Sequence, residues 1–249
     1  MIKWFRRIKI SLWFIPYIIL LQFIPVLKIT LWIFMIVLIH ELSHILMAYL
    51  FGYYSESITI YPFGISARIK DIEYMNIYHA ILIVLAGPLS HIIMISILNG
   101  ACHLGMISLV FYDYLLMVNQ SMLIFNLITI YPMDGGRLLQ MWLQLFFTYQ
   151  KANRIMYQIS ILFAIIMILI MKHFMITFMM IHLIIHNIKC LKHDYIQCYE
   201  FYRYRLKHPM SYPYRFHDKN DLYRGCMNVI MNDHFFFYEK QWINYKLNR

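Results

Sequence analysis

The sequence predicts an all-α polytopic membrane protein with about six transmembrane helices and a short cytosolic C-terminal tail. Of its 249 residues, 61% are hydrophobic and only 14% are charged, a composition that is unusual for a soluble domain of this length. Apolar stretches of about 20 residues, long enough to cross a bilayer, recur between residues 11 and 188. Basic residues also gather on one side of the predicted membrane.

Six apolar stretches are predicted to be the membrane spans. The first follows a basic N-terminal segment that resembles a signal peptide. It has no small-residue cleavage site and further spans follow, so we interpret it as a retained span. The predicted spans are 11–27, 29–51, 78–100, 114–133, 155–171 and 173–189.

The basic residues predict the orientation of the chain. With the N-terminus in the cytosol, all basic residues except Lys28 and Lys172 fall on the cytosolic side. This asymmetry is typical of membrane proteins, and an even number of spans places both termini in the cytosol. Anionic lipid headgroups then account for the formal charge of +10, and no nucleic-acid partner is indicated.

Composition changes once, near residue 190. We therefore predict a six-span domain at 1–189 and a short, basic, tyrosine-rich cytosolic tail at 190–249. The cysteines form no C-x-x-C pair, and three of them lie on the reducing side, so neither disulfides nor a cysteine metal site is predicted. These cysteines are Cys102, Cys190, Cys198 and Cys226.

Three ionisable residues interrupt the apolar run VLIHELSHIL at 37–46. They form an H-E-x-x-H pattern, in which His40 and His44 share one helix face and can bind one metal ion. Glu41 lies beside them as a candidate general base, as in zinc hydrolases. The pattern also occurs by chance on solvated helices. A carboxylate at membrane depth costs ~2.5–3.5 kcal/mol, however, and a bound dication would offset that cost, so the metal site is favoured.

Asp134 is the candidate third ligand, since zinc sites have at least three protein ligands. It lies in NLITIYPMDGGRLL, where Pro132 and the Gly135-Gly136 pair break the helical backbone. Such a break at membrane depth requires a lining of protein or water. His44 lies about 10 Å from the cytosolic end of its span, a depth similar to that of Asp134. The alternative is that Asp134 only caps a helix.

Other polar residues within the spans are open to more than one interpretation. His182 and His186 also have i, i+4 spacing, but no glutamate lies between them. We interpret them as interior polar residues satisfied by neighbouring helices rather than as ligands. His91 and Asn126 also indicate a polar interior. Asn126 either donates a hydrogen bond to a substrate carbonyl or joins two helices.

Two motifs together resemble those of the site-2 protease family of intramembrane metalloproteases. These are H-E-x-x-H in an early span and N-x-x-P-x-x-P-x-D-G-G in a later one, which begins here at Asn126 and has Thr129 in place of the first proline. YPFGISARI at 61–69 and LAGPLSH at 85–91 are similar to segments of its sporulation proteases, which process the precursor of sigma-K in endospore-forming bacteria. The resemblance covers about residues 1–205.

The resemblance implies a role for each motif residue. His40, His44 and Asp134 would ligate one zinc ion, and Glu41 would be the general base. The candidate substrate-binding or oxyanion residues are Asn126 and Pro132.

The resemblance also implies a small membrane-associated β element at 52–71, whose edge could add a substrate strand. The β-branched residues and central glycine of SITIYPFGISARI are compatible with a hairpin. Two features depart from the family. Ser43 replaces a glycine, and residues 190–249 are too few for a pair of nucleotide-sensing CBS modules, so the tail is at most a reduced CBS-type remnant.

The expected function is therefore that of a zinc metalloendopeptidase that cleaves a membrane-tethered protein near the cytosolic side. By resemblance, its substrate is the sigma-K precursor, its partners are regulatory membrane proteins of sporulation, and it lies in the mother-cell membrane around the forespore. A protease with a downstream glutamate ligand is disfavoured, because no later intramembrane glutamate exists. The other alternative is a non-proteolytic metal-binding or metal-transport protein. The nearly apolar outer half of the spans and the presence of Glu41 argue against it.

Overall fold

The computed structural model describes residues 8–10, 27–61, 64–208, 212–218, 221–232 and 235–247. The predicted first span, 11–27, lies outside the described residues except at its last position. The chain divides into two compact units. One contains residues up to 72 together with 81–127, and the other contains 73–80 together with 128–249.

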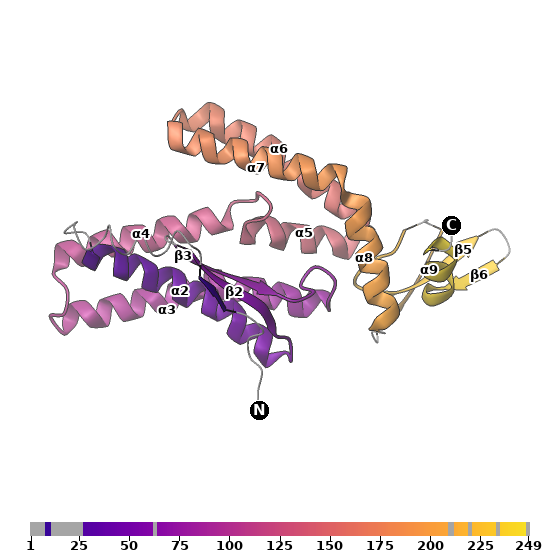
Figure 1. Cartoon of the computed structure of the whole chain (residues 1–249), viewed down its shortest axis with the longest axis horizontal. Helices are drawn as coiled ribbons and strands as arrows, with labels where there is room; N and C mark the ends of the chain where they lie inside the picture. The colour runs from indigo at the N-terminus through magenta and orange to yellow at the C-terminus, as the bar shows by residue number, and fades with distance from the viewer. Residues whose placement is uncertain are drawn as a thin grey trace. The chain divides into compact units, whose positions relative to one another are not determined.

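In its described residues, the first unit contains three helices and a small sheet (Figure 1). Helix α2 (Leu27–Leu50) packs against strand β3 and helix α4, and most of the long helix α3 also belongs to this unit. Apolar side chains join the three helices around Ile36, Met94 and Leu115. Helix α3 is Ile77–His103 and α4 is Leu109–Leu127.

The predicted β element at 52–71 is confirmed as an antiparallel hairpin. Strand β2 (Ser55–Tyr61) pairs with β3 (Gly64–Ile69), and β1 (Ile8–Ile10) adds to the other edge of β2 in parallel. Strand β1 was not predicted, because three residues within a basic N-terminal segment give no periodic signal. Since β2 is the central strand, β3 lies at one edge of the sheet that the described residues form.

The second unit contains a helical hairpin and a folded C-terminal region. Helices α6 (Tyr149–Met171) and α7 (Phe174–Lys192) pack side by side, joined at Lys172, which has a left-handed backbone (Figure 1). Helix α5 (Asp134–Phe146) precedes them and α8 (Asp194–Lys207) follows.

The C-terminal region is more ordered than the tail that the sequence predicts. Strands β4, β5 and β6 form a sheet in that order, and α9 packs against β5 and α8 around a buried core that includes Phe201 and Trp242. The protein is mostly helical, as predicted, but this second small sheet was not predicted. These elements are β4 (Tyr214–His217), β5 (Met227–Asn232), β6 (Phe235–Tyr238) and α9 (Glu239–Leu247).

Four described helices, α2, α3, α6 and α7, are long and apolar enough to cross a membrane. They correspond to four of the predicted spans. Helix α4, at the position of the predicted span 114–133, is not among the four, and it ends at Leu127 rather than at 133. The chain leaves the helix before Pro132, which cannot donate a backbone hydrogen bond. The total of six spans stays a prediction.

Candidate active site

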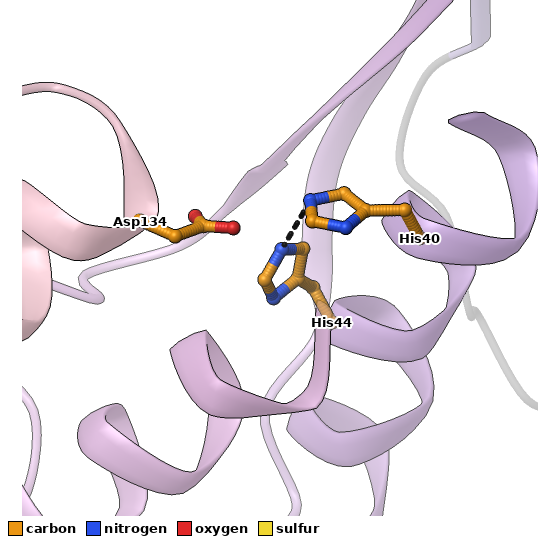
Figure 2. Close-up of side chains that lie close together, drawn as sticks. All are labelled: His40, His44 and Asp134. Carbon is orange, nitrogen blue, oxygen red and sulfur yellow. Dashed lines mark hydrogen bonds between the residues drawn. The ribbon is translucent and has the colours of Figure 1, made fainter. Parts of the chain in front are cut away.

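The two histidines of the H-E-x-x-H motif lie one turn apart on α2 and point to the same side (Figure 2). Both are buried, with His40 5% and His44 8% exposed. Their Nε2 atoms lie 3.3 Å apart. Two nitrogens that ligate one tetrahedral zinc ion at about 2.0–2.1 Å are separated by about 3.3–3.4 Å. The spacing of the pair therefore fits a shared zinc ion.

A backbone carbonyl on α3 fixes the tautomer of His44. Its Nδ1 lies 2.8 Å from the carbonyl oxygen of Ile83, which can only accept a hydrogen bond, so Nδ1 carries the proton. The lone pair of the neutral ring is then on Nε2, the atom that faces His40. Histidines that ligate metals usually have such a partner on the second ring nitrogen.

Gly87 brings α3 into direct contact with the two imidazoles. A Cβ atom at this position would lie 2.2 Å from Nε2 of His44 and 2.7 Å from Cε1 of His40. Pro88 lies inside the helix, and the hydroxyl of Ser90 donates to the carbonyl of Gly87 at 2.6 Å. The LAGPLSH segment therefore forms the wall against which the histidines pack.

His91 extends this polar cluster toward α4. Its ring lies 5.2 Å from the ring of His40, centroid to centroid, and its Nδ1 lies 2.7 Å from Oδ1 of Asn119. The amide nitrogen of Asn119 in turn donates to the carbonyl of His91. The polar interior predicted at His91 is confirmed. Asn119 was missed, although an asparagine within an apolar stretch was a usable signal.

Glu41 lines a cavity of about 550 Å³ between α2 and α4. His40 lies in the same wall, and Asn126 contributes from α4. The structure thus brings the candidate base, one candidate ligand and the candidate substrate-binding amide to one pocket. Ser43 lies outside its lining, and its hydroxyl donates to the carbonyl of Ile39 in its own helix at 2.7 Å. The hydroxyl of Ser43 therefore has its hydrogen-bond partner within its own helix.

Asp134 is the first residue of α5 and is 9% exposed. Met133 holds the N-cap position, so the alternative in which Asp134 is the cap residue is wrong. A Cβ on Gly136 would lie 2.5 Å from the backbone of Ile130 and Tyr131, so this close approach requires glycine. The peptide bond between Tyr131 and Pro132 is cis.

Buried side chains of α6 and α7 hold the segment before Asp134. The amide of Tyr131 donates to Oγ of Ser160 at 2.9 Å, and its carbonyl accepts from Nδ2 of Asn187 at 2.7 Å. The Tyr131 hydroxyl donates to Glu73 at 2.7 Å. Protein groups therefore satisfy the broken backbone, as expected for an irregular segment at membrane depth. The roles of Ser160 and Asn187 were not predicted from the sequence.

Figure 2 shows the three candidate ligands. Among the residues that the structure describes, His40, His44 and Asp134 form a group of possible metal ligands, and one ligand atom of each lies within 4.8 Å of those of the other two. His182 and His186 do not belong to this group. His186 is half-buried and stacks on the ring of Tyr131, as an interior residue would, but His182 is exposed, so the interior position predicted for it is wrong.

No family model matches the chain, but known proteins are similar to it in sequence and in structure. The chain is 29% identical over 140 residues to stage IV sporulation protein FB of Bacillus subtilis (strain 168). The match covers 56% of this chain and 49% of that protein, so the chain spans about half the length of this curated relative.

The structure is also similar to that of the site-2 protease from Methanocaldococcus jannaschii. The TM-score is 0.54 at 24% sequence identity, and the match covers 77% of this chain and 93% of that one. This likeness shows a common fold. The chain, a membrane protein by its four long apolar helices, is thus similar in fold to a site-2 protease and in sequence to a sporulation protein.

Proposed function

We propose that this membrane protein is an intramembrane zinc metalloprotease that hydrolyses a peptide bond of a membrane-tethered protein near the cytosolic side. The spacing of 3.3 Å between the buried Nε2 atoms of His40 and His44 is the observation that supports this most directly. These histidines and Asp134 would hold one zinc ion, which supplies Lewis-acid polarisation of a carbonyl and activation of water.

The role proposed for Glu41 is that of general base. Its carboxylate lies in the pocket beside His40, accepts a proton from the attacking water and returns it to the leaving amine. Asn126, in the same pocket, offers an amide N–H to a substrate carbonyl. Pro132 shapes the segment that presents Asp134. Strand β3, at the edge of the described sheet, can hold an extended substrate through backbone hydrogen bonds.

We infer further that the protein acts in sporulation. The curated relative is a sporulation protein, and the motif segments resemble those of sporulation proteases. The proposed substrate is accordingly the sigma-K precursor, the proposed partners are regulatory membrane proteins of sporulation, and the proposed location is the mother-cell membrane around the forespore.

The proposed function is tested by measuring whether cleavage of the substrate depends on zinc. Purified protein in detergent is expected to cleave the sigma-K precursor, to lose this activity with a zinc chelator and to regain it with Zn²⁺ but not Mg²⁺, because imidazole ligands suit zinc. Product formation is followed by mass spectrometry and metal content by elemental analysis. Metal binding without cleavage would support the metal-binding alternative instead. Cleavage that persists in metal-free protein would refute the zinc mechanism.

Asn187→Ala is expected to weaken zinc binding about 10–100-fold, the usual effect of losing a group that positions a metal ligand. The substitution leaves the Tyr131 carbonyl without its donor at 2.7 Å, so the segment before Asp134 loosens. Zinc affinity is measured by competition with a chromophoric chelator. His182→Ala is the control, since His182 is exposed on the same helix. Equal zinc affinity in both variants would contradict the positioning role of Asn187.

A further inference from the structure

The pocket beside Glu41 has one wall from each of two helices. Helix α2 contributes Val37, His40 and Glu41. The other wall is one face of α4, with residues at i, i+1, i+4, i+5, i+8 and i+9, as helical periodicity requires. These residues are Met117, Val118, Ser121, Met122, Phe125 and Asn126. Since one helix bears the candidate base, whatever occupies the pocket lies against the reacting groups.

The side chains that line the pocket are mostly apolar. Met117, Met122 and Phe125 dominate the α4 wall, and among the lining residues that the structure describes Glu41 is the only Asp, Glu, Lys or Arg. A substrate carboxylate would be repelled by the carboxylate of Glu41. Any charged side chain would also lose its hydration, and an apolar wall offers no polar group to replace the lost water. An uncharged, apolar side chain would instead gain burial.

The size and shape of the pocket further restrict which side chains can occupy it. A cavity of about 550 Å³ is in the range of ligand pockets. Two of its lining residues on α4, Met117 and Met122, are methionines, whose flexible side chains adapt to neighbours of different shape. Met117 is 58% exposed, so this wall reaches the surface of the unit. The pocket can therefore take large apolar side chains of more than one shape.

We propose that the face of α4 formed by Met117, Met122 and Phe125 is the subsite that selects a large apolar side chain of the substrate next to the cleaved bond. This inference rests on the proposed function. In this arrangement Asn126 and Ser121 are the polar groups on the same face that can bind the substrate backbone, while the apolar residues sort side chains by size and charge. Met122 is half-buried in the wall and is the position at which added volume fills the pocket.

A library of single-span membrane substrates tests this without assuming the natural substrate. Four consecutive positions near the cytosolic membrane boundary are randomised, and the cleaved members are identified by sequencing. The wild type is expected to enrich Leu, Met and Phe and to deplete Asp, Glu and Lys. Met122→Trp is expected to lower cleavage of Leu- and Phe-containing members about tenfold or more relative to Ala- and Gly-containing ones.

Ile124→Trp is the matched control, because Ile124 lies on the same helix, is 67% exposed and does not line the pocket. It is expected to keep the wild-type preference. Met122→Ala is the second variant and is expected to admit Trp-containing members. Zinc content, measured for each variant, reports whether the site has folded.

The outcomes separate the inference from the proposed function. If the wild type cleaves the library no more than Glu41→Gln does, both the proposed function and the subsite are overturned. Cleavage that depends on Glu41 but shows the same preference in Met122→Trp, Met122→Ala and wild type would overturn the subsite alone. A wild-type preference for charged residues would do the same.

Discussion

Glu41→Gln is expected to lower the rate of peptide-bond cleavage about 10²–10⁴-fold while zinc stays bound. Glutamine has nearly the same shape as glutamate but cannot accept a proton from water at neutral pH. Glu41 lines the pocket beside His40, and it does not belong to the group formed by His40, His44 and Asp134. The substitution therefore removes the base and leaves the candidate ligands in place.

This expectation is checked by measuring both quantities on the same preparation. Cleavage is quantified by mass spectrometry and zinc by elemental analysis. Glu56→Gln is the control, since Glu56 is an exposed glutamate on β2 in the same unit and lies outside the pocket lining. If Glu41→Gln cleaves at the wild-type rate, Glu41 is not the base. If it loses zinc together with activity, Glu41 acts on the metal rather than on the proton.

The sequence predicted the features that depend on local geometry. His40 and His44 share a face because they are four residues apart on one helix, and any helix through this segment has that property. The hairpin at 52–71 was likewise predictable, because its strands are adjacent in sequence and rich in β-branched residues. The break in the helical backbone near Asp134 was predicted from Pro132 and the Gly135-Gly136 pair, and it lies between the end of α4 and the start of α5.

The groups that position the ligands could not be predicted in the same way. The Ile83 carbonyl, which orients His44, is a backbone atom 39 residues away and carries no side-chain signal. Gly87 acts through the absence of a side chain, which is informative only once the packing of α3 on α2 is known. Ser160 and Asn187 were visible as polar residues in apolar spans, but their partner is the backbone of Tyr131.

The strands of the C-terminal region were not predicted, for a different reason. Averaged over sixty residues, its composition is polar and basic, and this average hides short strand-forming runs such as NVIM and FFFY. In the structure these runs become β5 and β6, which pair in an antiparallel register. Arg205 and Glu239 form a buried ion pair beside them, in which Nε of Arg205 lies 2.6 Å from Oε1 of Glu239. Buried charged residues such as these count as charged in the composition although solvent does not reach them. The charge of this region therefore did not show whether it is folded.

Gly87→Ala is expected to abolish high-affinity zinc binding, with at least a 100-fold loss in affinity, and to abolish cleavage with it. The added Cβ would lie 2.2 Å from Nε2 and 2.4 Å from Cε1 of His44, closer than carbon atoms approach nitrogen or carbon in folded proteins. Relief requires the imidazole to rotate, which breaks its bond to Ile83, or α3 to move away. Either change displaces the Nε2 atom that would bind the metal, and overpacking of this kind also costs about 1–3 kcal/mol of stability.

The matched substitution on the same helix is Gly100→Ala, because a Cβ there would have no atom within 4 Å. Alanine favours helix formation over glycine by about 1 kcal/mol, so this variant is expected to keep wild-type zinc affinity and to be slightly more stable. Zinc affinity by chelator competition and unfolding temperature are measured for both. Both variants introduce the same methyl group into α3, so a difference between them arises from contact with the histidines rather than from helix propensity. Wild-type zinc affinity in Gly87→Ala would show that the imidazoles bind metal from a position other than the one in which Gly87 packs against them, and the 3.3 Å spacing would then no longer support the site.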